Sequence, residues 1–342
     1  MPKNAPLNTR QNEAGRLLLV GWEGIDEGEP ISLLEEVRPA GFIFFARNFP
    51  GSFERLKDQL GRIKEEGRKI LKRQILLAID HEGGSVNRLP LAEAILPSAR
   101  EAGSLLALGK RELVARMFSR ASAFLMDLGF NFNLAPVVDV ALEDSFIGGR
   151  SFGDGPREVL IAASLFCRCF ADSGLLVCGK HFPGLGSATL DPHVELPIIS
   201  RTIQDLWEID GLPYRGLIKM GLDAIMTTHA IYRSLDPLLP ATYSSKIVDL
   251  IKKDYAFKGL VLTDDLEMGA LKGIFTLGES ASEAVIAGHD LCLVCHKREN
   301  VLAAHEGLLK AISDYRITPS RVLKSVKRLN RTLKALEERS NN

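Results

Sequence analysis

The chain carries acidic and imidazole side chains at a spacing that suits acid–base chemistry. Within residues 179–197, GKHFPGLGSATLDPHVELP, a single residue separates Asp191 from His193. In an extended segment these two side chains lie on the same side, so the carboxylate can orient the imidazole for proton transfer. The pair could therefore protonate a leaving group. The same spacing also fits an aspartate that caps a turn beside a surface histidine.

A second candidate for chemistry is the acidic pair that ends the apolar segment GLVLTDD, residues 259–265. Asp264 could face a ligand at this point as a nucleophile. Neighbouring side chains along a strand point to opposite faces, so at most one of Asp264 and Asp265 should face the ligand. We assign the chemistry to Asp264 and expect Asp265 to bind the backbone of a loop.

Charged groups of both signs stand at the ends of other segments and could bind a polar ligand. Mixed-sign side chains presented from separate strand ends suit the hydroxyl and amide groups of a sugar, which they would bind through charge-assisted hydrogen bonds. Each could instead form an ion pair within the protein. The candidate ligand-binding residues are Asp80, Arg88, Arg150, Lys180 and His181.

These residues need a scaffold that brings distant segments together, and the hydrophobic pattern predicts one. Eight short apolar segments alternate with segments of helical periodicity, including residues 53–67, 112–129, 157–174 and 244–256. Nearly continuous apolar strands are covered on both faces, as in a parallel sheet, and eight such units favour an α/β fold, a closed (β/α)8 TIM barrel. The predicted strands are residues 16–22, 41–48, 74–80, 130–140, 175–181, 223–230, 259–265 and 290–296.

Most of the predicted strands end in polar residues. The active site of a (β/α)8 barrel is built at the C-terminal ends of its strands, so these residues should converge on one mouth. This pattern indicates an enzyme, although such residues could also be the solvated starts of loops. The residues at strand ends are Asn48, Asp80, Asp139, Lys180, His181, His229, Asp264 and Asp265.

Composition narrows the classes of partner. The 342 residues include 43 basic and 43 acidic side chains, so the chain lacks the positive field that nucleic-acid binding requires. The apolar run LLLVG near the N-terminus is too short for a signal peptide or a membrane span, which predicts a cytoplasmic protein without membrane contact. We expect a monomer with a single domain over residues 1–342, polar ends at about 1–13 and 335–342, and no metal or cofactor.

The cysteines and three short motif matches do not indicate any additional function. The odd number of cysteines, five in mostly apolar settings, predicts reduced thiols without disulfides. GLGSAT (184–189) lacks the third glycine of a dinucleotide site, and CLVCH (292–296), which matches a haem-attachment motif, lies inside a predicted strand. DHEGGS (80–85) has serine where a zinc-protease helix would have its second histidine.

Several motifs together resemble a known family. DHEGGSVNRL, IGGRSFG, KHFPGLG followed by DPH, and VLTDDLEM occur in this order between about residues 80 and 268. They are similar to motifs of the single-domain β-N-acetylglucosaminidases of glycoside hydrolase family 3, the type that acts in bacterial cell-wall recycling. The resemblance implies a (β/α)8 barrel and a retaining exo-glycosidase that removes terminal N-acetylglucosamine from muropeptide-type saccharides.

The resemblance also implies a role for each candidate residue. Asp264 matches the nucleophile that forms a covalent glycosyl-aspartate, and His193 with Asp191 matches an acid/base dyad. In most retaining glycosidases a second carboxylate performs this proton transfer. The positions that match residues holding the N-acetylglucosamine unit are Asp80, Arg88, Arg150, Lys180 and His181.

Departures from the family pattern leave alternatives open. Leu185, Pro192 and Ser85 replace the histidine, serine and arginine that are common at these positions, and Pro192 should stiffen the loop within the dyad. A phosphorylase, which would use inorganic phosphate in place of water, is one alternative. The others are a β-glucosidase of the same barrel family and a sugar-binding barrel without catalysis.

Overall fold

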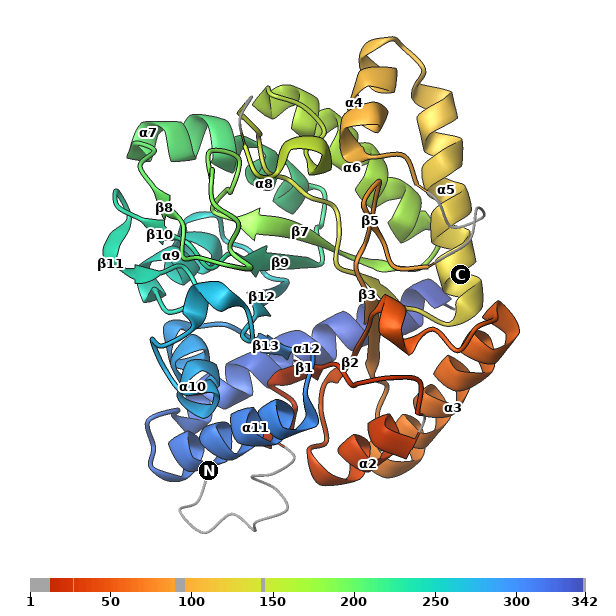
Figure 1. The fold of residues 1–342 in the computed structure, drawn as a ribbon, viewed down its shortest axis with the longest axis vertical. Helices are drawn as coiled ribbons and strands as arrows, with labels where there is room; N and C mark the ends of the chain where they lie inside the picture. Colours follow the sequence, from red (N-terminus) through yellow and green to blue (C-terminus); the bar gives the residue numbers. More distant parts are fainter. Residues whose placement is uncertain (1–12, 27, 90–95, 143–144, 341–342) are drawn as a thin grey trace.

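The computed structural model describes residues 13–340 except 27, 90–95 and 143–144, so most of the polar end expected at residues 1–13 lies outside it. Eight parallel strands form a closed barrel in which each strand pairs with its neighbours along the chain, and helices surround it (Figure 1). The predicted (β/α)8 TIM barrel is therefore confirmed. The barrel strands are β1 (Leu18–Val20), β2 (Gly41–Phe44), β3 (Leu76–Ile79), β6 (Phe132–Asn133), β7 (Leu176–Phe182), β9 (Ala224–Thr227), β12 (Leu260–Asp265) and β13 (Leu291–Val294).

The helices form where the sequence has helical periodicity, including all four of the segments named above. In α3, for example, Ser52 caps the first turn by accepting a hydrogen bond from the backbone N–H of Arg55, and Leu56, Leu60 and Ile63 face the core. The longer helices are α2 (Gly28–Glu36), α3 (Phe53–Leu71), α4 (Ala99–Ala107), α5 (Arg111–Leu128), α6 (Pro156–Asp172), α8 (Gly211–Lys219), α10 (Leu277–Ala287), α11 (Arg298–Ser313) and α12 (Pro319–Ser340). The shorter α9 (Ser245–Asp249) continues into the π-helical segment η4 (Leu250–Asp254).

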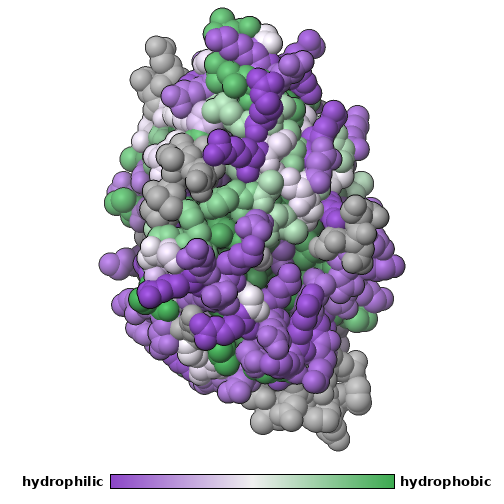
Figure 2. All heavy atoms as spheres, turned by 90° about the vertical axis from the view of Figure 1, so that its right-hand side faces the viewer, coloured by the Kyte–Doolittle hydropathy of each residue, from purple (hydrophilic) through white to green (hydrophobic). Residues whose placement is uncertain are grey.

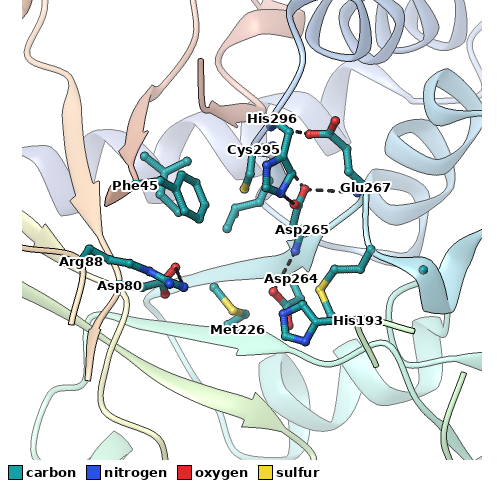
Figure 3. Close-up of a pocket in the computed structure, with 14 residues that line it drawn as sticks. Phe45, Asp80, Arg88, His193, Met226, Asp264, Asp265, Glu267, Cys295 and His296 are labelled. Atoms are coloured by element: carbon teal, nitrogen blue, oxygen red, sulfur yellow. Dashed lines mark hydrogen bonds and ion pairs between the residues drawn. The ribbon is translucent and has the colours of Figure 1, made fainter. Parts of the chain in front are cut away.

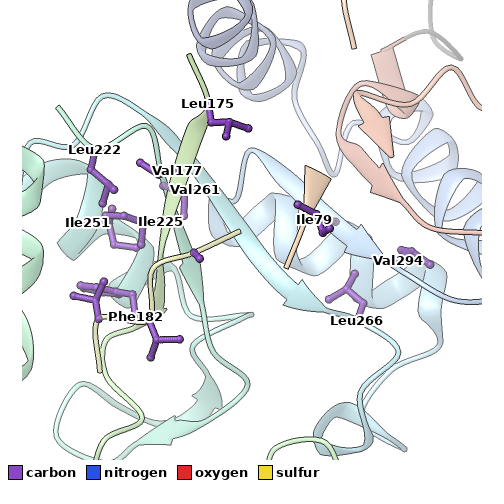
Figure 4. Close-up of a cluster of buried hydrophobic side chains, with 14 of the residues drawn as sticks. Ile79, Leu175, Val177, Phe182, Leu222, Ile225, Ile251, Val261, Leu266 and Val294 are labelled. Carbon is purple, nitrogen blue, oxygen red and sulfur yellow. The ribbon is translucent and has the colours of Figure 1, made fainter. Parts of the chain in front are cut away.

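Two apolar layers follow from the alternation of side chains along each strand. In β12, Leu260 and Leu262 pack inside the barrel, whereas Val261 belongs to the layer between barrel and helices (Figure 4). The next inward position is Asp264. In β7, Leu176 and Cys178 pack inside in the same way, and the next inward position is Lys180. The period of two thus directs these two charged side chains toward the C-terminal mouth of the barrel.

The N-terminal end of the barrel is closed by α12. Leu329, Leu333 and Leu336 are buried in the same cluster as the inward-facing strand residues. The guanidinium of Arg328 donates to the backbone carbonyl of Gly259 at 2.6 Å, next to the start of β12. The helix continues to Ser340, through residues expected to form a polar end, and Leu336 is only 2% exposed.

Most of the predicted strands are shorter in the structure than expected, and the strand predicted at residues 130–140 is shortened the most. Residues 130–140 were predicted as a strand, but only Phe132–Asn133 form β6, followed by an isolated bridge between Val137 and Lys180. Pro136 interrupts the ladder because proline has no backbone N–H to donate. The chain then runs irregularly to Asp139, which is buried.

Asn48 does not join the mouth of the barrel. It lies in the 3-10 turn η1 (Ala46–Asn48), where its side-chain amide donates to the carbonyl oxygens of Trp22 and Gly24 and its carbonyl accepts from the N–H of Phe45. Asn48 therefore shapes the loop after β2 and is not a site residue.

Polar side chains predominate on the face of the molecule shown in Figure 2, and the cysteine thiols lie inside the fold. Figure 2 shows hydrophilic side chains over most of one face, with hydrophobic residues gathered near its middle. All five cysteines are buried and free. In the part of the chain that the structure describes, no helix combines the length and the apolar character needed to cross a membrane.

Candidate active site

A pocket of about 370 Å³ opens at the C-terminal ends of the barrel strands (Figure 3). Of the eight predicted site residues, Asp80, Arg88, His193 and Asp264 line it. The pocket has an apolar side as well as a charged one, which is typical of a site for a small molecule. Its apolar lining includes Ile43, Phe45, Met226, Met268 and Leu293.

The predicted binding residues are joined by a buried charge network. The ammonium of Lys180 contacts Asp80 Oδ1 at 2.7 Å and Glu82 Oε1 at 2.6 Å. The guanidinium of Arg150 donates to both oxygens of Glu82, at 2.8 and 2.9 Å. Arg88 lies further out, 3.9 Å from Asp80. Alternating charges thus connect the pocket wall at Asp80 to Arg150.

Glu82 is the central carboxylate of this network, and sequence reasoning missed it. Glu82 lies in β4 (His81–Gly83), two residues after Asp80, so an extended chain places both carboxylates on one side. This spacing from Asp80 was the feature of the sequence from which Glu82 could have been identified as a site residue. Glu82 is buried and neutralises Lys180 and Arg150 together.

Electrostatics keep Glu82, Lys180 and Arg150 ionised. Burial would raise the pKa of Glu82, but Lys180 and Arg150 outweigh it and hold that pKa far below its usual range. Burial would lower the pKa of Lys180, yet Asp80 and Glu82 raise it above the ordinary value. The cations therefore remain charged, and hydrogen bonds from them to a ligand would be charge-assisted.

His181 is held in one tautomer by its neighbours. Its Nδ1 lies 2.8 Å from Asp139 Oδ2, and its Nε2 lies 3.3 Å from an Arg150 nitrogen. Because arginine only donates, Nε2 accepts and Nδ1–H donates to Asp139. Asp139 also accepts from the backbone N–H of Leu185 at 2.7 Å, so it anchors the start of the loop that leads to the dyad.

Asp264 presents a carboxylate with one uncommitted oxygen. Its Oδ1 accepts from the backbone N–H of Asp265 at 2.8 Å. Burial alone would raise the pKa of Asp264, but nearby His229, His181 and Lys180 lower it, so the group is ionised at neutral pH. Among the described carboxylates that line the pocket, Asp264 alone has an oxygen, Oδ2, without a polar protein contact.

One expectation about Asp265, its orientation away from the ligand, was wrong, and the other, its contact with loop backbone, was confirmed. We expected at most one of the two aspartates to face the ligand, yet both line the pocket. The register shifts between Leu262 and Asp265 where β12 pairs with β13, which breaks the simple alternation. As expected, Asp265 binds loop backbone: it accepts from the N–H groups of Glu267 and Cys295, both at 3.2 Å.

His229, in the segment that follows β9, holds the backbone beside Asp264. Its Nε2–H donates to the backbone carbonyl of Asp265 at 2.8 Å, and its Nδ1 lies 2.6 Å from the hydroxyl of Thr242. Burial lowers the pKa of His229, although the nearby Asp264 and Asp265 oppose this shift. His229 thus holds the backbone next to Asp264 in place.

The predicted dyad forms at the rim of the pocket. His193 Nδ1 lies 2.7 Å from Asp191 Oδ1, and the same oxygen accepts from the backbone N–H of His193 at 2.8 Å. The imidazole is 63% exposed, so its other nitrogen is accessible to a ligand. Asp191 is not itself part of the pocket wall, and it reaches the pocket only through His193.

The segment that carries the dyad rests on the turn after β12. The carbonyl oxygens of Pro192 and His193 accept from the N–H groups of Ala270 and Gly269, both at 3.1 Å. Pro192 is buried in this contact. A Cβ atom on Gly269 would lie 2.5 Å from the carbonyl oxygen of His193, so only glycine permits this close approach.

The fold and the pocket define a barrel enzyme whose carboxylates and imidazole suit nucleophilic and acid–base chemistry. The sequence profile described as the glycosyl hydrolase family 3 N terminal domain matches residues 13–332. The chain therefore belongs to glycosyl hydrolase family 3 and is a glycosidase.

Several relatives share most of their length with this chain. It is 32% identical over 300 residues to a protein of Psychromonas ingrahamii named beta-hexosaminidase, covering 86% of each chain. It is 31% identical over 297 residues to the beta-hexosaminidase of Haemophilus influenzae, covering 85% of this chain and 82% of that one.

Solved structures share the architecture. A family 3 β-N-acetylglucosaminidase of Paenibacillus sp. superposes with a TM-score of 0.91 at 31% identity, covering 98% of this chain but 63% of that one. A family 3 glycosyl hydrolase of Mycobacterium smegmatis superposes with a TM-score of 0.85 at 29% identity, covering 96% of this chain and 98% of that one.

Proposed function

We propose that the protein is a retaining exo-β-N-acetylglucosaminidase that forms a covalent intermediate on Asp264. One observation carries the proposal: Asp264 is an ionised pocket carboxylate with a free oxygen, and it shares the pocket with the exposed imidazole of His193. A nucleophile and a proton donor in one pocket are what retaining hydrolysis requires. The names of the relatives support the choice of substrate.

The other pocket carboxylates are less suited to attack a sugar. Both oxygens of Asp265 are committed, to two backbone N–H groups and to His296. Both oxygens of Glu267 are committed to backbone N–H groups of His296 and Lys297 and to the Asn300 amide. Asp80 is bound to Lys180 and faces Arg88. This leaves Asp264 as the nucleophile.

The Asp191–His193 dyad supplies the acid and base in this mechanism. In the first step His193 protonates the leaving oxygen while Asp264 attacks the anomeric carbon, and Asp191 stabilises the imidazole that carries the proton. In the second step the same imidazole removes a proton from water, which displaces Asp264. The charged network of Asp80, Lys180 and Arg150 would hold the sugar through its hydroxyl groups.

The natural substrate in this proposal is a muropeptide-type saccharide with terminal N-acetylglucosamine, which the protein would process in cell-wall recycling. This part rests on the resemblance of the motifs. Transfer to inorganic phosphate is the main alternative, because an imidazole does not repel an approaching anion as a carboxylate would.

Trapping of the intermediate tests the proposal. The protein is incubated with an aryl β-N-acetylglucosaminide that carries a fluorine to slow the second step, and the labelled residue is mapped by mass spectrometry. We expect one label, on Asp264. Asp264→Ala should lower kcat/KM for the unmodified glycoside by about 10³-fold or more. A label on another residue would contradict the assignment, and so would an undiminished rate in Asp264→Ala.

Product analysis separates hydrolysis from phosphorolysis. With and without inorganic phosphate, we expect free N-acetylglucosamine as the product. If a sugar phosphate forms when phosphate is added, the protein is a phosphorylase and the proposal of hydrolysis is wrong.

A further inference from the structure

The segment that carries the dyad begins and ends beside one buried carboxylate, that of Asp210. This dyad segment, residues 184–201, follows β7 and ends just before the short helix α7 (Ile203–Asp205) (Figure 1). Asp210 is the last residue of the π-helical segment η3 (Leu206–Asp210), and its side chain is 1% exposed. Asp210 does not line the active-site pocket.

The start of the dyad segment packs directly on Asp210. A Cβ atom on Gly184 would lie 2.7 Å from Asp210 Oδ1 and 2.8 Å from its Cγ, so only glycine lets the backbone approach the carboxylate this closely. The hydroxyl of Tyr232, in β10 (Ile231–Tyr232), donates to the carbonyl oxygen of Gly184 at 2.8 Å. The backbone at the start of the dyad segment is therefore held against Asp210.

The end of the dyad segment contacts the same carboxylate through Arg201. Its Nε lies 3.1 Å from Asp210 Oδ2, and the side chain of Arg201 is only 10% exposed. The backbone carbonyl of Arg201 accepts from the hydroxyl of Ser234 at 2.8 Å. Asp210 thus lies between the two ends of the dyad segment.

The contact between Asp210 and Arg201 depends on charge. Within the described part of the chain, no donor makes an aligned hydrogen bond to either oxygen of Asp210, and Arg201 is the cation within ion-pair distance. A neutral Asp210 would leave the nearly buried guanidinium without a counter-charge, which is unfavourable. Arg201 would then turn toward water and draw the end of the dyad segment with it.

Asp210 changes its charge near neutral pH. Burial raises the pKa of Asp210 to about 7, because Arg201 opposes the effect only in part and Asp139 and Asp205 add to it. The group is therefore protonated below this pH and ionised above it. The other ionisable groups around Asp210 are buried tyrosines, whose pKa values burial raises, so they stay uncharged. They are Tyr214 of α8, Tyr232 of β10 and Tyr255 after η4.

We propose that Asp210 and Arg201 are positioning residues, which hold the two ends of the dyad segment together so that His193 reaches the leaving oxygen. The ionised form of Asp210 holds the segment, and the protonated form releases it. This inference rests on the proposed glycosidase function and adds two residues and a pH dependence to it. Neither residue lines the pocket, so both act through the position of the imidazole.

Aryl β-N-acetylglucosaminides with two different leaving groups test this role. Dinitrophenolate is stable enough as an anion to leave without a proton, whereas phenolate needs one from His193. The value of kcat/KM reports the first step, in which the leaving group departs. Loss of alignment of the imidazole therefore slows the phenyl glycoside and spares the dinitrophenyl glycoside. General damage to the pocket slows both.

We expect Asp210→Asn to lower kcat/KM for the phenyl glycoside about fivefold at about pH 8.5, and to change that for the dinitrophenyl glycoside less than about twofold. Asparagine resembles the protonated carboxyl group. The unchanged protein and the variant should therefore differ less than about twofold on the phenyl glycoside at about pH 5.5. Groups common to both proteins cancel in this comparison.

Arg201→Gln removes the other half of the contact. It should show the same selective loss on the phenyl glycoside, and the double variant should lose no more than either single variant, because the two residues act as one unit. If Asp210→Asn does not fold by circular dichroism, Arg201→Gln provides the same test.

The matched control is Glu208→Gln, an exposed carboxylate of η3 that accepts from the Gln204 amide, and it should match the unchanged protein on both glycosides. An equal loss on the two glycosides, a loss that does not depend on pH, or no loss at all would overturn the inference and leave the glycosidase function intact. If the unchanged protein cleaves neither glycoside, the proposed function fails and this inference fails with it.

Discussion

At the scale of single residues, Glu82 determines the charge balance of the site. It is one carboxylate that contacts two cations, the buried Lys180 and the partly buried Arg150. Removal of one partner from a buried charge network leaves the others uncompensated, which costs more than the contact itself contributes.

Glu82→Gln keeps the size of the side chain and removes its charge. We expect the free energy of unfolding to fall by about 3 kcal/mol, since Lys180 and Arg150 lose their shared counter-charge. Displacement of these two groups should lower kcat/KM about ten- to hundredfold. Chemical denaturation and steady-state kinetics measure the two effects.

The control is Glu65→Gln, at an exposed position of α3, which should change neither quantity. If Glu82→Gln matches the wild type in stability and activity, Glu82 does not organise the network.

The sequence identified the residues of the site more reliably than the directions in which their side chains point. The spacing of Asp191 and His193 predicted their pairing correctly because the contact is local. The orientation of Asp265 could not be predicted, since it depends on a register shift between two strands that are distant in sequence. The same is true of Asp139, which binds His181 from the irregular segment after β6.

At the scale of elements, the segment that carries the dyad depends on the turn η5 (Gly269–Leu271). Two backbone hydrogen bonds hold Pro192 and His193 against this turn. The position of the imidazole is therefore set by the end of β12, the strand that also carries Asp264.

Gly269→Ala should disturb this contact. The added Cβ would lie 2.5 Å from the His193 carbonyl oxygen and 2.9 Å from that of Val194, so the segment must move away. We expect kcat/KM to fall about tenfold as His193 loses its alignment. The melting temperature should change little because the segment is on the surface.

Kinetics and thermal denaturation of this variant provide the test. Gly61→Ala, in α3 with open space around its Cβ position, is the matched control and should keep full activity. Full activity in Gly269→Ala would mean that the segment does not need this turn to place His193.

Helices and strands could be predicted from the sequence where the local pattern of apolar residues determines them. The short apolar runs of β7 and β12 and the helical period of α3 predicted the correct element types. The segment 130–140 was assigned too long a strand because its apolar run continues through Pro136, and the pattern alone does not show where the ladder ends.

At the scale of the whole molecule, α12 completes the interior of the barrel from one end. Leu329→Ala removes a buried side chain from that contact, so we expect the free energy of unfolding to fall by about 2–5 kcal/mol. Chemical denaturation measures this loss. The activity should be unchanged under native conditions because the helix lies at the end opposite the pocket.

Leu323→Ala serves as the control, since Leu323 lies on the same helix but is 51% exposed. It should have a small effect on stability. Similar losses for the two variants would show that α12 does not close the barrel through its buried face.

The closure of the barrel by α12 also bears on how the chain is synthesised. A ribosome releases all eight strands before this helix emerges, so the nascent barrel has an uncovered apolar interior until the last turns of α12 are made. Translation that pauses within α12 would expose Leu176 and Leu260 to water and to chaperones. Slow codons in this part of the message would therefore lower the yield of folded enzyme more than the same codons in a surface loop.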